Sequence, residues 1–355
     1  YTAFNPTDSS SLKPQLYIPP QQEVEQIVNA CVQRAQSIWM IEGDYRMGKT
    51  SLLNSAAVEM RKKGVVPCMV DFCALTGQDF PDLLNGLAEE ISASTGIVQS
   101  GAPLRYGTNF LRYLSNLVSV MEQQSPSSSS LALLLENLPE LQKNHVLADF
   151  ANLLISLVGN RFQFPGLYRV TVVITGGFYL DFLSESNLST LRDRITPGCG
   201  TTVTLKDLDQ TQTCLLVQGG MQDISWLDTE QVNSLGLWIY EYTSGHPSLV
   251  QGLGGILHAD LKQKCTLTKP LVEQAAESLA AELVGKPGTF RKKLELADQK
   301  WNLLDTAKSL VHADMRYQPL DPPTHILETL GLLKKNNDRC TLRNEIFRKA
   351  MKLWC

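Results

Sequence analysis

Over the first 205 residues, short apolar runs alternate with longer segments in which apolar residues recur at helical spacing. The runs lie at residues 38–41, 65–72, 131–137, 168–177 and 201–205, and the helical segments at 21–36, 49–63, 80–94, 108–123, 146–158 and 178–194. Short apolar runs are typical of strands, and a period near 3.6 is typical of helices. Strands that alternate with helices predict an α/β fold, a parallel sheet with helices on both faces.

The strand pattern ends near Leu205, and the rest of the chain predicts two further regions. Segments 208–221, 229–242, 247–262 and 269–284 have helical periodicity and predict an all-α domain over residues 206–285. Residues 286–304, 306–312 and 323–330 predict more helices, followed by two short strands around an Asn/Asp turn and by a helix over 344–353. Three helices followed by a hairpin predict a winged-helix domain over residues 286–355.

The first apolar run leads into the sequence GDYRMGKT, which fits the phosphate-loop pattern G-x-x-x-x-G-K-T. Glycines let main-chain N–H groups converge on a phosphate chain, and the helix that follows points the positive end of its dipole at it. Lys49 adds a positive charge for the β- and γ-phosphates, and Thr50 a hydroxyl ligand for Mg²⁺. A chance match is the alternative, but the position between strand and helix argues against it. We expect ATP or ADP with Mg²⁺ to be held by Gly43, Asp44, Tyr45, Arg46, Met47, Gly48, Lys49, Thr50 and Ser51.

An acidic residue ends the most apolar run, LALLLEN at residues 131–137. Continuous apolarity over so few residues favours a central strand buried on both faces. Phosphate hydrolysis needs one acid at such a strand end for Mg²⁺ and a second acid to orient the attacking water. Glu136 can fill the first role, with an ordinary strand-end acid as the alternative. The amide of Asn137 can position a water but cannot take its proton, so we expect hydrolysis to be slow, or absent without a partner.

The 168–177 run ends in a hydroxyl residue and two glycines. If this strand neighbours the loop strand, Thr175 points at the γ-phosphate region and belongs with Glu136 and Asn137 among the catalytic candidates. Arg192 and Arg194, at the end of the next predicted helix, could reach a nucleotide or could be ordinary surface residues.

Two other segments are candidates for nucleotide contact. The corner TSGHP at residues 243–247 joins two predicted helices, and His246 could approach a phosphate there, although a loop histidine without a ligand is the alternative. The segment Tyr17, Ile18 and Pro19 precedes the first predicted helix. It could cover the base of the nucleotide, or its helix could simply pack on the sheet.

Composition and charge narrow the class of protein. The chain of 355 residues is 43% hydrophobic with a net charge of −4, but residues 286–355 carry 14 Lys and Arg against 8 Asp and Glu. This asymmetry indicates nucleic-acid contact or two domains that attract each other. Because no apolar run approaches a membrane span and the eight cysteines lack C-x-x-C spacing, we expect a cytoplasmic protein with reduced cysteines and no membrane contact. The numbering begins at Tyr1 and not at a methionine, so the sequence could be one module of a longer chain.

Five stretches together resemble the bacterial AAA-like ATPases of the STAND class, signal-transducing relatives of AAA+ proteins. They are Tyr17–Pro19, Gly43–Thr50, Leu131–Asn137, TSGHPSL at 243–249, and LGLL at 330–333 with RNEIFR at 343–348. The resemblance implies an arm over residues 1–36 that covers the base, a P-loop core at 37–205, a helical lid at 206–285 and a winged helix at 286–355. It assigns Pro247 to the base and His246 to the phosphate side.

The chain departs from the class at two places. The class usually has Asp-Glu where this sequence has Glu136 and Asn137, and an arginine where it has Pro20. The resemblance implies a nucleotide-dependent switch that acts through self-association or release of a fused or partner effector, in bacterial defence or signalling. A DNA-binding AAA+ ATPase that uses the basic winged helix, and a pseudo-ATPase with a structural nucleotide, are the alternatives.

Overall fold

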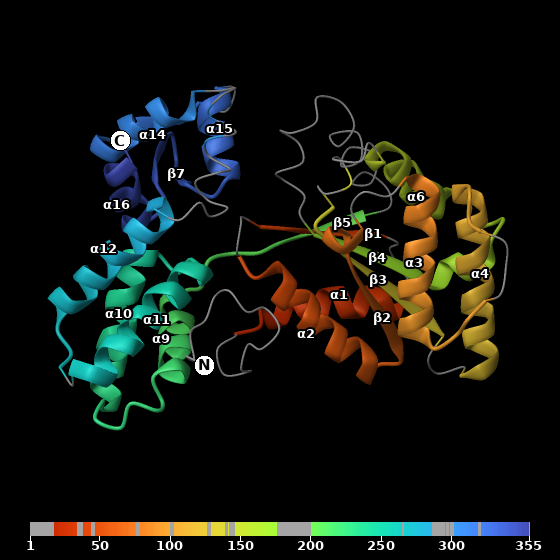
Figure 1. Ribbon diagram of the computed structural model, residues 1–355, viewed down its shortest axis with the longest axis horizontal. Coiled ribbons are helices and arrows are strands. Elements are labelled where there is room, and N and C mark those ends of the chain that lie inside the picture. The colour runs from red at the N-terminus through yellow and green to blue at the C-terminus, as the bar shows by residue number, and fades with distance from the viewer. Residues whose placement is uncertain are drawn as a thin grey trace. The chain divides into compact units, whose positions relative to one another are not determined.

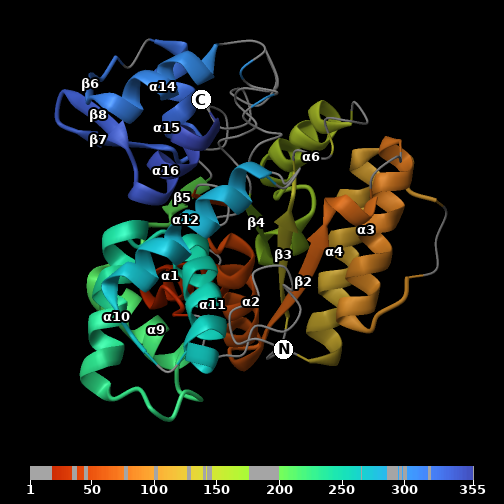
Figure 2. The same cartoon turned by 60° about the vertical axis from the view of Figure 1, so that its left-hand side comes forward.

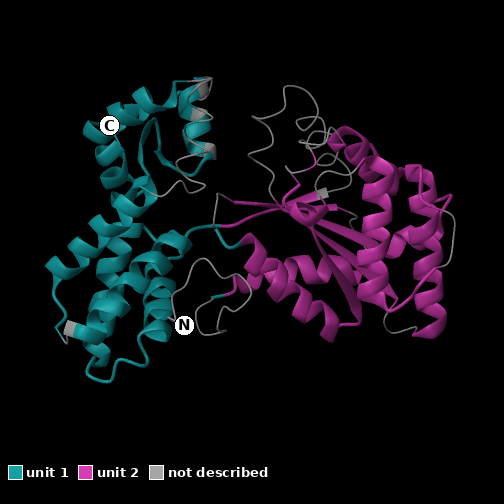
Figure 3. Cartoon of the chain, viewed as in Figure 1, with its two compact units in different colours: residues 1–18, 44–48, 206–355 teal, residues 19–43, 49–205 magenta. Residues whose placement is uncertain are grey.

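A computed structural model of the protein describes residues 18–33, 38–43, 47–75, 79–99, 103–125, 129–138, 146–175, 200–264, 266–285, 302–318 and 321–354, with the single residues 141, 295 and 298. The chain divides into two compact units (Figure 3). Residues 19–43 and 49–205 form the unit that we call the core, and residues 206–355 make up most of the other.

A five-stranded sheet lies at the centre of the core, and its pairs are all parallel (Figure 1). The strands are β1 (Ile38–Glu42), β2 (Val65–Asp71), β3 (Ser130–Glu136), β4 (Val170–Thr175) and β5 (Gly200–Thr204). They are arranged in the order β2-β3-β4-β1-β5, with β1 between β4 and β5. The prediction of an α/β fold with a parallel sheet is confirmed.

Helices cover both faces of the sheet (Figure 2). Helices α3 (Phe80–Thr95), α4 (Gly107–Gln124) and α6 (Leu147–Gly159) share one hydrophobic cluster with alternate residues of β2, β3 and β4. Helices α1 (Gln21–Gln33) and α2 (Lys49–Lys62) pack together on the opposite face. Every residue of β1 and of β3 is buried, because a parallel strand covered on both sides has no polar face.

Two local features of the core differ from the sequence prediction. The apolar run from residue 168 begins in a 3₁₀ turn, Pro165–Arg169, and the strand itself starts only at Val170. A second 3₁₀ turn, Phe72–Leu75, takes the last residue of the run predicted as the second strand. The buried Phe72 extends the apolar run beyond β2, whereas the predicted start of the fourth strand, Tyr168 and Arg169, belongs to the turn that leads into β4.

Helices make up residues 206–285 as predicted: α9 (Gln210–Gly220), α10 (Thr229–Thr243), α11 (Pro247–Lys264) and α12 (Lys269–Gly285). Helices α9 and α10 both begin with a capping box. In α10 the side chain of Asp228 accepts from Gln231 N, while the Gln231 side chain accepts from Asp228 N. These reciprocal bonds satisfy N–H groups that the first turn of a helix leaves without partners.

The C-terminal region has the order α14 (Leu303–His312), β6 (Met315–Arg316), α15 (Pro322–Thr329), β7 (Leu333–Asn336), β8 (Arg339–Leu342) and α16 (Glu345–Trp354). Its three strands form an antiparallel sheet in the order β6-β8-β7. The predicted hairpin is present, with Asn337 in the left-handed conformation that a tight turn needs. The two-residue strand β6 was not predicted, because two residues show no periodicity.

Several predictions fall on residues that are not described: the helix at 178–194 with Arg192 and Arg194, and most of the helix at 286–304. Where the structure describes the chain, it contains no helix that is both long enough and apolar enough to cross a membrane.

Candidate nucleotide-binding site

The parallel sheet brings the polar residues Asp71, Glu136 and Thr175 to one edge of the core. Asp71 ends β2 and is the register partner of Glu136, which ends β3. Thr175 ends β4 and is the partner of Ile41, one residue before the end of β1. Because parallel strands all end at the same edge, these side chains share it with Gly43 and the N-terminus of α2. Ligands of open α/β sheets bind outside this carboxyl edge.

The structure describes the two ends of the phosphate-loop motif, Gly43 at the start and residues 47–50 at the finish. Gly48 has a φ of 88°, a left-handed conformation that favours glycine. Helix α2 begins at Lys49, whose Nζ donates to the carbonyl of Gly43 at 2.7 Å and so reaches back across the loop. Met47 is buried, and Ser51 is half-buried in the first turn of α2. Asp44, Tyr45 and Arg46 lie outside the described residues.

Glu136 lies beside the start of the loop helix. The residue is 9% exposed, and the hydroxyl of Thr50 hydrogen-bonds to its carboxylate. Burial raises the pKa of Glu136, the Thr50 bond lowers it, the charge of Asp71 raises it and that of Lys49 lowers it, with a net rise. The pairing of a hydroxyl with a carboxylate supplies the hard oxygen donors that Mg²⁺ prefers. Thr50 and Glu136 therefore fit a Mg²⁺ ion held beside a nucleotide.

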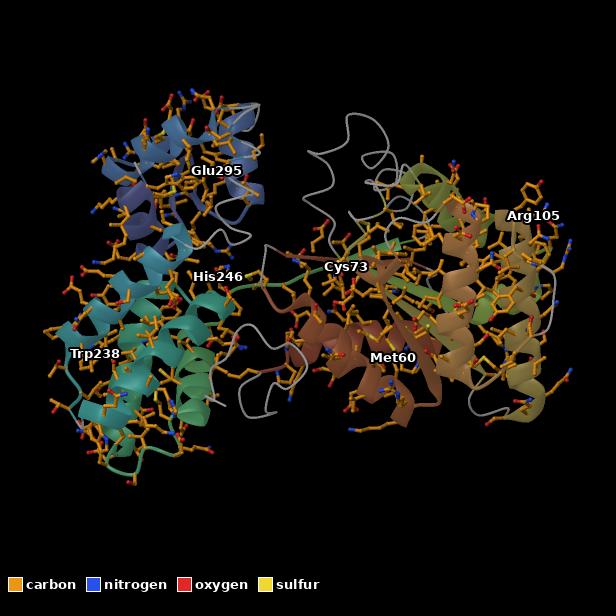
Figure 4. All side chains as sticks on the ribbon, in the orientation of Figure 1. Met60, Cys73, Arg105, Trp238, His246 and Glu295 are labelled. Carbon is orange, nitrogen blue, oxygen red and sulfur yellow. The ribbon has the colours of Figure 1, made fainter. Side chains whose placement is uncertain are left out.

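Asp71 is a feature of this edge that the sequence analysis missed. Asn137 Nδ2 donates to Asp71 Oδ1 at 2.8 Å, and Cys73 N donates to the same oxygen at 2.9 Å. Cys73, labelled in Figure 4, lies just past the end of β2. The available signal was an acid at the end of the second apolar run, in the same place as Glu136 at the end of the third.

Thr175 satisfies the condition that the sequence analysis set for it, because β4 pairs directly with β1. The residue is 4% exposed, and its Oγ1 donates to the carbonyl of Leu135 in β3 at 3.4 Å. This long bond ties the end of β4 to the strand that carries Glu136. Thr175 thus lies between the loop strand and the acidic strand end.

The predicted corner at residues 243–247 is a tightly built turn between α10 and α11. Gly245 has a φ of +76°, and a Cβ there would lie 1.8 Å from the carbonyl oxygen of Leu208, so only glycine fits. His246 is 3% exposed, and its ring packs edge-to-face against Phe347, with centroids 5.8 Å apart. Its Nδ1 lies 3.3 Å from Ser248 Oγ. His246, which is labelled in Figure 4, precedes Pro247, the first residue of α11.

The N-terminal arm is described only from Ile18 onwards. Ile18 and Pro19 are half-buried, and Tyr17 lies outside the described residues. Helix α1 buries Val24, Ile27 and Cys31 and contacts α2, β3 and β4. Packing of this helix on the sheet, one of the two alternatives for the arm, is therefore observed.

The strand order, the loop between β1 and α2, and the acid at the end of β3 define the fold of P-loop ATPases related to AAA+ proteins, with a helical region after the core. The chain belongs to the AAA-like domain family, which it matches over residues 5–352. No curated protein sequence matches it significantly.

Solved structures agree on the fold. The Walker-type ATPase PABY2304 of Pyrococcus abyssi is 12% identical, with 96% of this chain and 99% of that chain covered and a TM-score of 0.65. The ORC2 protein of Aeropyrum pernix is 15% identical, with 98% and 97% covered; the TM-score is 0.54 for its ADPNP–ADP complexes and 0.53 for its ADP form. At such identities the likeness shows the fold alone.

Proposed function

We propose that the chain binds ATP or ADP with Mg²⁺ at the carboxyl edge of the core sheet and hydrolyses ATP slowly. The observation that carries this proposal is the joint placement of Lys49 Nζ across the loop on Gly43 O and of Glu136 against the Thr50 hydroxyl. An ammonium group over the loop and a hydroxyl–carboxylate pair beside it are the groups that a Mg²⁺–nucleotide needs. The ADP and ADPNP in the A. pernix ORC2 complexes support this choice of ligand.

Each candidate residue has a role in this proposal. Main-chain N–H groups of residues 43–51 hold the phosphates, Lys49 neutralises them, and Thr50 and Glu136 hold Mg²⁺. When bound, the ion stabilises the charge that develops on the phosphate oxygens. Thr175 contacts the γ-phosphate, and the amide of Asn137 positions a water without taking its proton.

The resemblance supports further roles outside the core. Tyr17, Ile18 and Pro19 cover the base, Pro247 packs against it, and His246 contributes on the phosphate side. The buried position of the His246 ring restricts that contribution to a state in which its packing on Phe347 is released.

We further propose a nucleotide-dependent switch of the STAND type, located in the cytoplasm. Its domains are an arm (1–36), a P-loop core (37–205), a helical lid (206–285) and a winged helix (286–355), and the order α14-β6-α15-β7-β8-α16 supports the last assignment. A ligand biases two conformations only as far as it binds them differently. The γ-phosphate supplies that difference through its contacts with Thr175, Lys49 and the metal. The output is self-association or release of an effector in bacterial defence or signalling.

Nucleotide extraction and single-turnover hydrolysis test this proposal. Denaturing the purified protein and separating the supernatant by chromatography is expected to release ADP or ATP. A single-turnover assay, with protein in excess over ATP, then distinguishes a slow ATPase from a pseudo-ATPase with a structural nucleotide. Absence of bound nucleotide together with no affinity for added ATP or ADP would reject the proposal.

DNA binding is a second candidate function, favoured by one surface. Lys334, Lys335 and Arg339 are all exposed on the β7–β8 hairpin, and Lys335 Nζ lies 4.2 Å from the centre of the Tyr317 ring. Arg343, which also lies in the basic region 286–355, does not belong to this surface. Its side chain is 11% exposed and pairs with Asp207 Oδ2 at 2.9 Å.

Salt dependence tests the DNA-binding candidate. Contacts between these basic side chains and phosphates would make DNA affinity fall steeply as salt rises. We expect DNA affinity to depend less on salt when Lys334, Lys335 and Arg339 are all replaced by alanine. No binding of duplex DNA at low salt would reject the candidate and leave nucleotide binding intact.

A further inference from the structure

Slow hydrolysis leaves one chemical role unassigned, that of the group which takes the proton from the attacking water. The residue after the metal acid is Asn137, whose amide cannot accept this proton. Glu136 is engaged with the Thr50 hydroxyl, and the proposed function assigns it to Mg²⁺. The hydroxyl of Thr175 is too weak a base near neutral pH. Among the described residues, two further carboxylates end strands at this edge, Glu42 of β1 and Asp71 of β2. Glu42 is buried, at 6% exposure, whereas Asp71 is exposed, so Asp71 is the one that water reaches.

The position of Asp71 is set by the sheet. In parallel register it is the direct partner of Glu136, so the two carboxylates extend from neighbouring strand ends. Neighbouring strands lie roughly 4.8 Å apart, which is close enough for two side chains to contact one bound water. Asp71 is also exposed, so water can reach it.

Two donors orient the Asp71 carboxylate through Oδ1 and leave Oδ2 to accept a proton. Asn137 Nδ2 and Cys73 N both donate to Oδ1, at 2.8 Å and 2.9 Å. Oδ2 makes no hydrogen bond to any residue that the structure describes. A carboxylate fixed by one oxygen, with the other directed to solvent, has the geometry of a general base that needs orientation but must keep a lone pair open.

Asn137 is adapted to this positioning role. It has a φ of 57°, a left-handed conformation that asparagine tolerates better than most residues. That backbone turn directs its side chain across to β2, where it meets Asp71. Asn137, which stands where the resembled class has a glutamate, therefore holds the carboxylate of Asp71 in place.

We propose that Asp71 is the catalytic base of ATP hydrolysis and that Asn137 is its positioning residue; this inference rests on the proposed ATP binding. Asp71 Oδ2 accepts one proton from a water molecule as the water oxygen forms a bond to the γ-phosphorus. The bond between the γ-phosphorus and the bridging oxygen breaks, and its electron pair leaves with ADP. The products are ADP, inorganic phosphate and a protonated Asp71, which returns its proton to solvent. Because Asn137 orients its carboxylate, Asp71 can serve as the base in place of the glutamate that the resembled class usually has at position 137.

The test compares Asp71→Asn, Asn137→Gly and the control Glu89→Gln with the wild-type chain. Asp71→Asn keeps the shape of the side chain but removes its basicity. Asn137→Gly keeps the left-handed backbone but removes the amide. Glu89 is an exposed acid on α3, away from the sheet edge, so its variant controls for loss of one charge. Each full-length protein is measured for ADP affinity by calorimetry and for single-turnover hydrolysis of ATP with Mg²⁺.

We expect all four proteins to bind ADP equally well, which also shows that the variants are folded. The hydrolysis rate should fall by at least about 100-fold in Asp71→Asn, as loss of a general base requires, by less in Asn137→Gly, and not at all in Glu89→Gln. Hydrolysis by Asp71→Asn at the wild-type rate would overturn the inference, as would a wild-type chain that binds ATP but does not hydrolyse it. In both cases ATP binding would stand; failure of the wild-type chain to bind nucleotide would instead reject the proposed function itself.

Discussion

At the scale of single residues, Asn137 shows how a sequence pattern and a structure can assign different roles to one side chain. From the sequence, Asn137 only fills the place of a missing acid. In the structure it adopts a left-handed conformation and donates to Asp71, a residue 66 positions earlier. A contact of this range depends on strand register, which the apolar pattern of separate strands does not specify.

The variant Asn137→Glu separates the two interpretations. If position 137 only lacks an acid, glutamate there should raise hydrolysis. If Asn137 holds Asp71, the variant loses that bond, repels the carboxylate and places a long side chain in a left-handed conformation that costs about 1–2 kcal/mol. We predict a lower single-turnover rate than wild type, and a higher rate would support the simpler interpretation.

The raised pKa of Glu136 predicts that the free energy of unfolding of the nucleotide-free protein depends on pH. Its folded-state pKa is raised above the ordinary value of 4.5, chiefly by burial. The folded state therefore holds the proton more tightly than the unfolded state does. Between the ordinary and the raised pKa, the free energy of unfolding should fall as pH rises. Urea unfolding at a series of pH values should show this fall in wild type and a smaller one in Glu136→Gln. Equal slopes in the two proteins would contradict the burial of an ionisable group here.

At the scale of elements, the strands and helices followed from periodicity because each carries its own apolar pattern. The five core strands and helices α9–α12 appear close to their predicted bounds. The 3₁₀ turns and β6 did not. Phe72 of one turn continues the apolar run of β2, the other turn leads directly into β4, and a two-residue strand has no pattern. In the candidate site, the loop and Glu136 followed from local motifs, whereas Asp71 required the order of strands in the sheet.

Close packing of α9 against α10 gives a prediction at this scale. A Cβ on Gly236 of α10 would lie 2.8 Å from Cys214 Sγ and 2.9 Å from Cys214 Cα in α9. Gly236→Ala must push the helices apart and should lower the free energy of unfolding by about 1–3 kcal/mol. Gly285, at the end of α12, is the matched control, because a Cβ added there would meet no atom within 4 Å. Gly285→Ala should be neutral or stabilise by up to about 1 kcal/mol, and equal effects of the two variants in urea unfolding would contradict the close contact.

At the scale of the whole molecule, an ion pair connects two residues that are far apart in the sequence, within the unit formed mostly by residues 206–355. Arg343 Nε donates to Asp207 Oδ2 at 3.0 Å across 136 residues, linking the segment before α9 to the start of α16. Removing one partner leaves the other charge half-buried. Arg343→Ala should therefore lower stability by about 3 kcal/mol, the lower end for buried pairs. Thermal unfolding checks this, and an unchanged transition would show that the pair contributes nothing to stability.

Calorimetric titration of Mg²⁺–ADP and Mg²⁺–ATP into nucleotide-stripped protein tests the central claim most directly, with wild type and Lys49→Ala compared. Lys49 lies across the phosphate loop on Gly43 O, so its ammonium charge is placed for the β- and γ-phosphates. We predict saturable binding at one site in wild type and loss of binding in a folded Lys49→Ala variant. Equal affinities in the two proteins, or no heat of binding in either, would contradict the account.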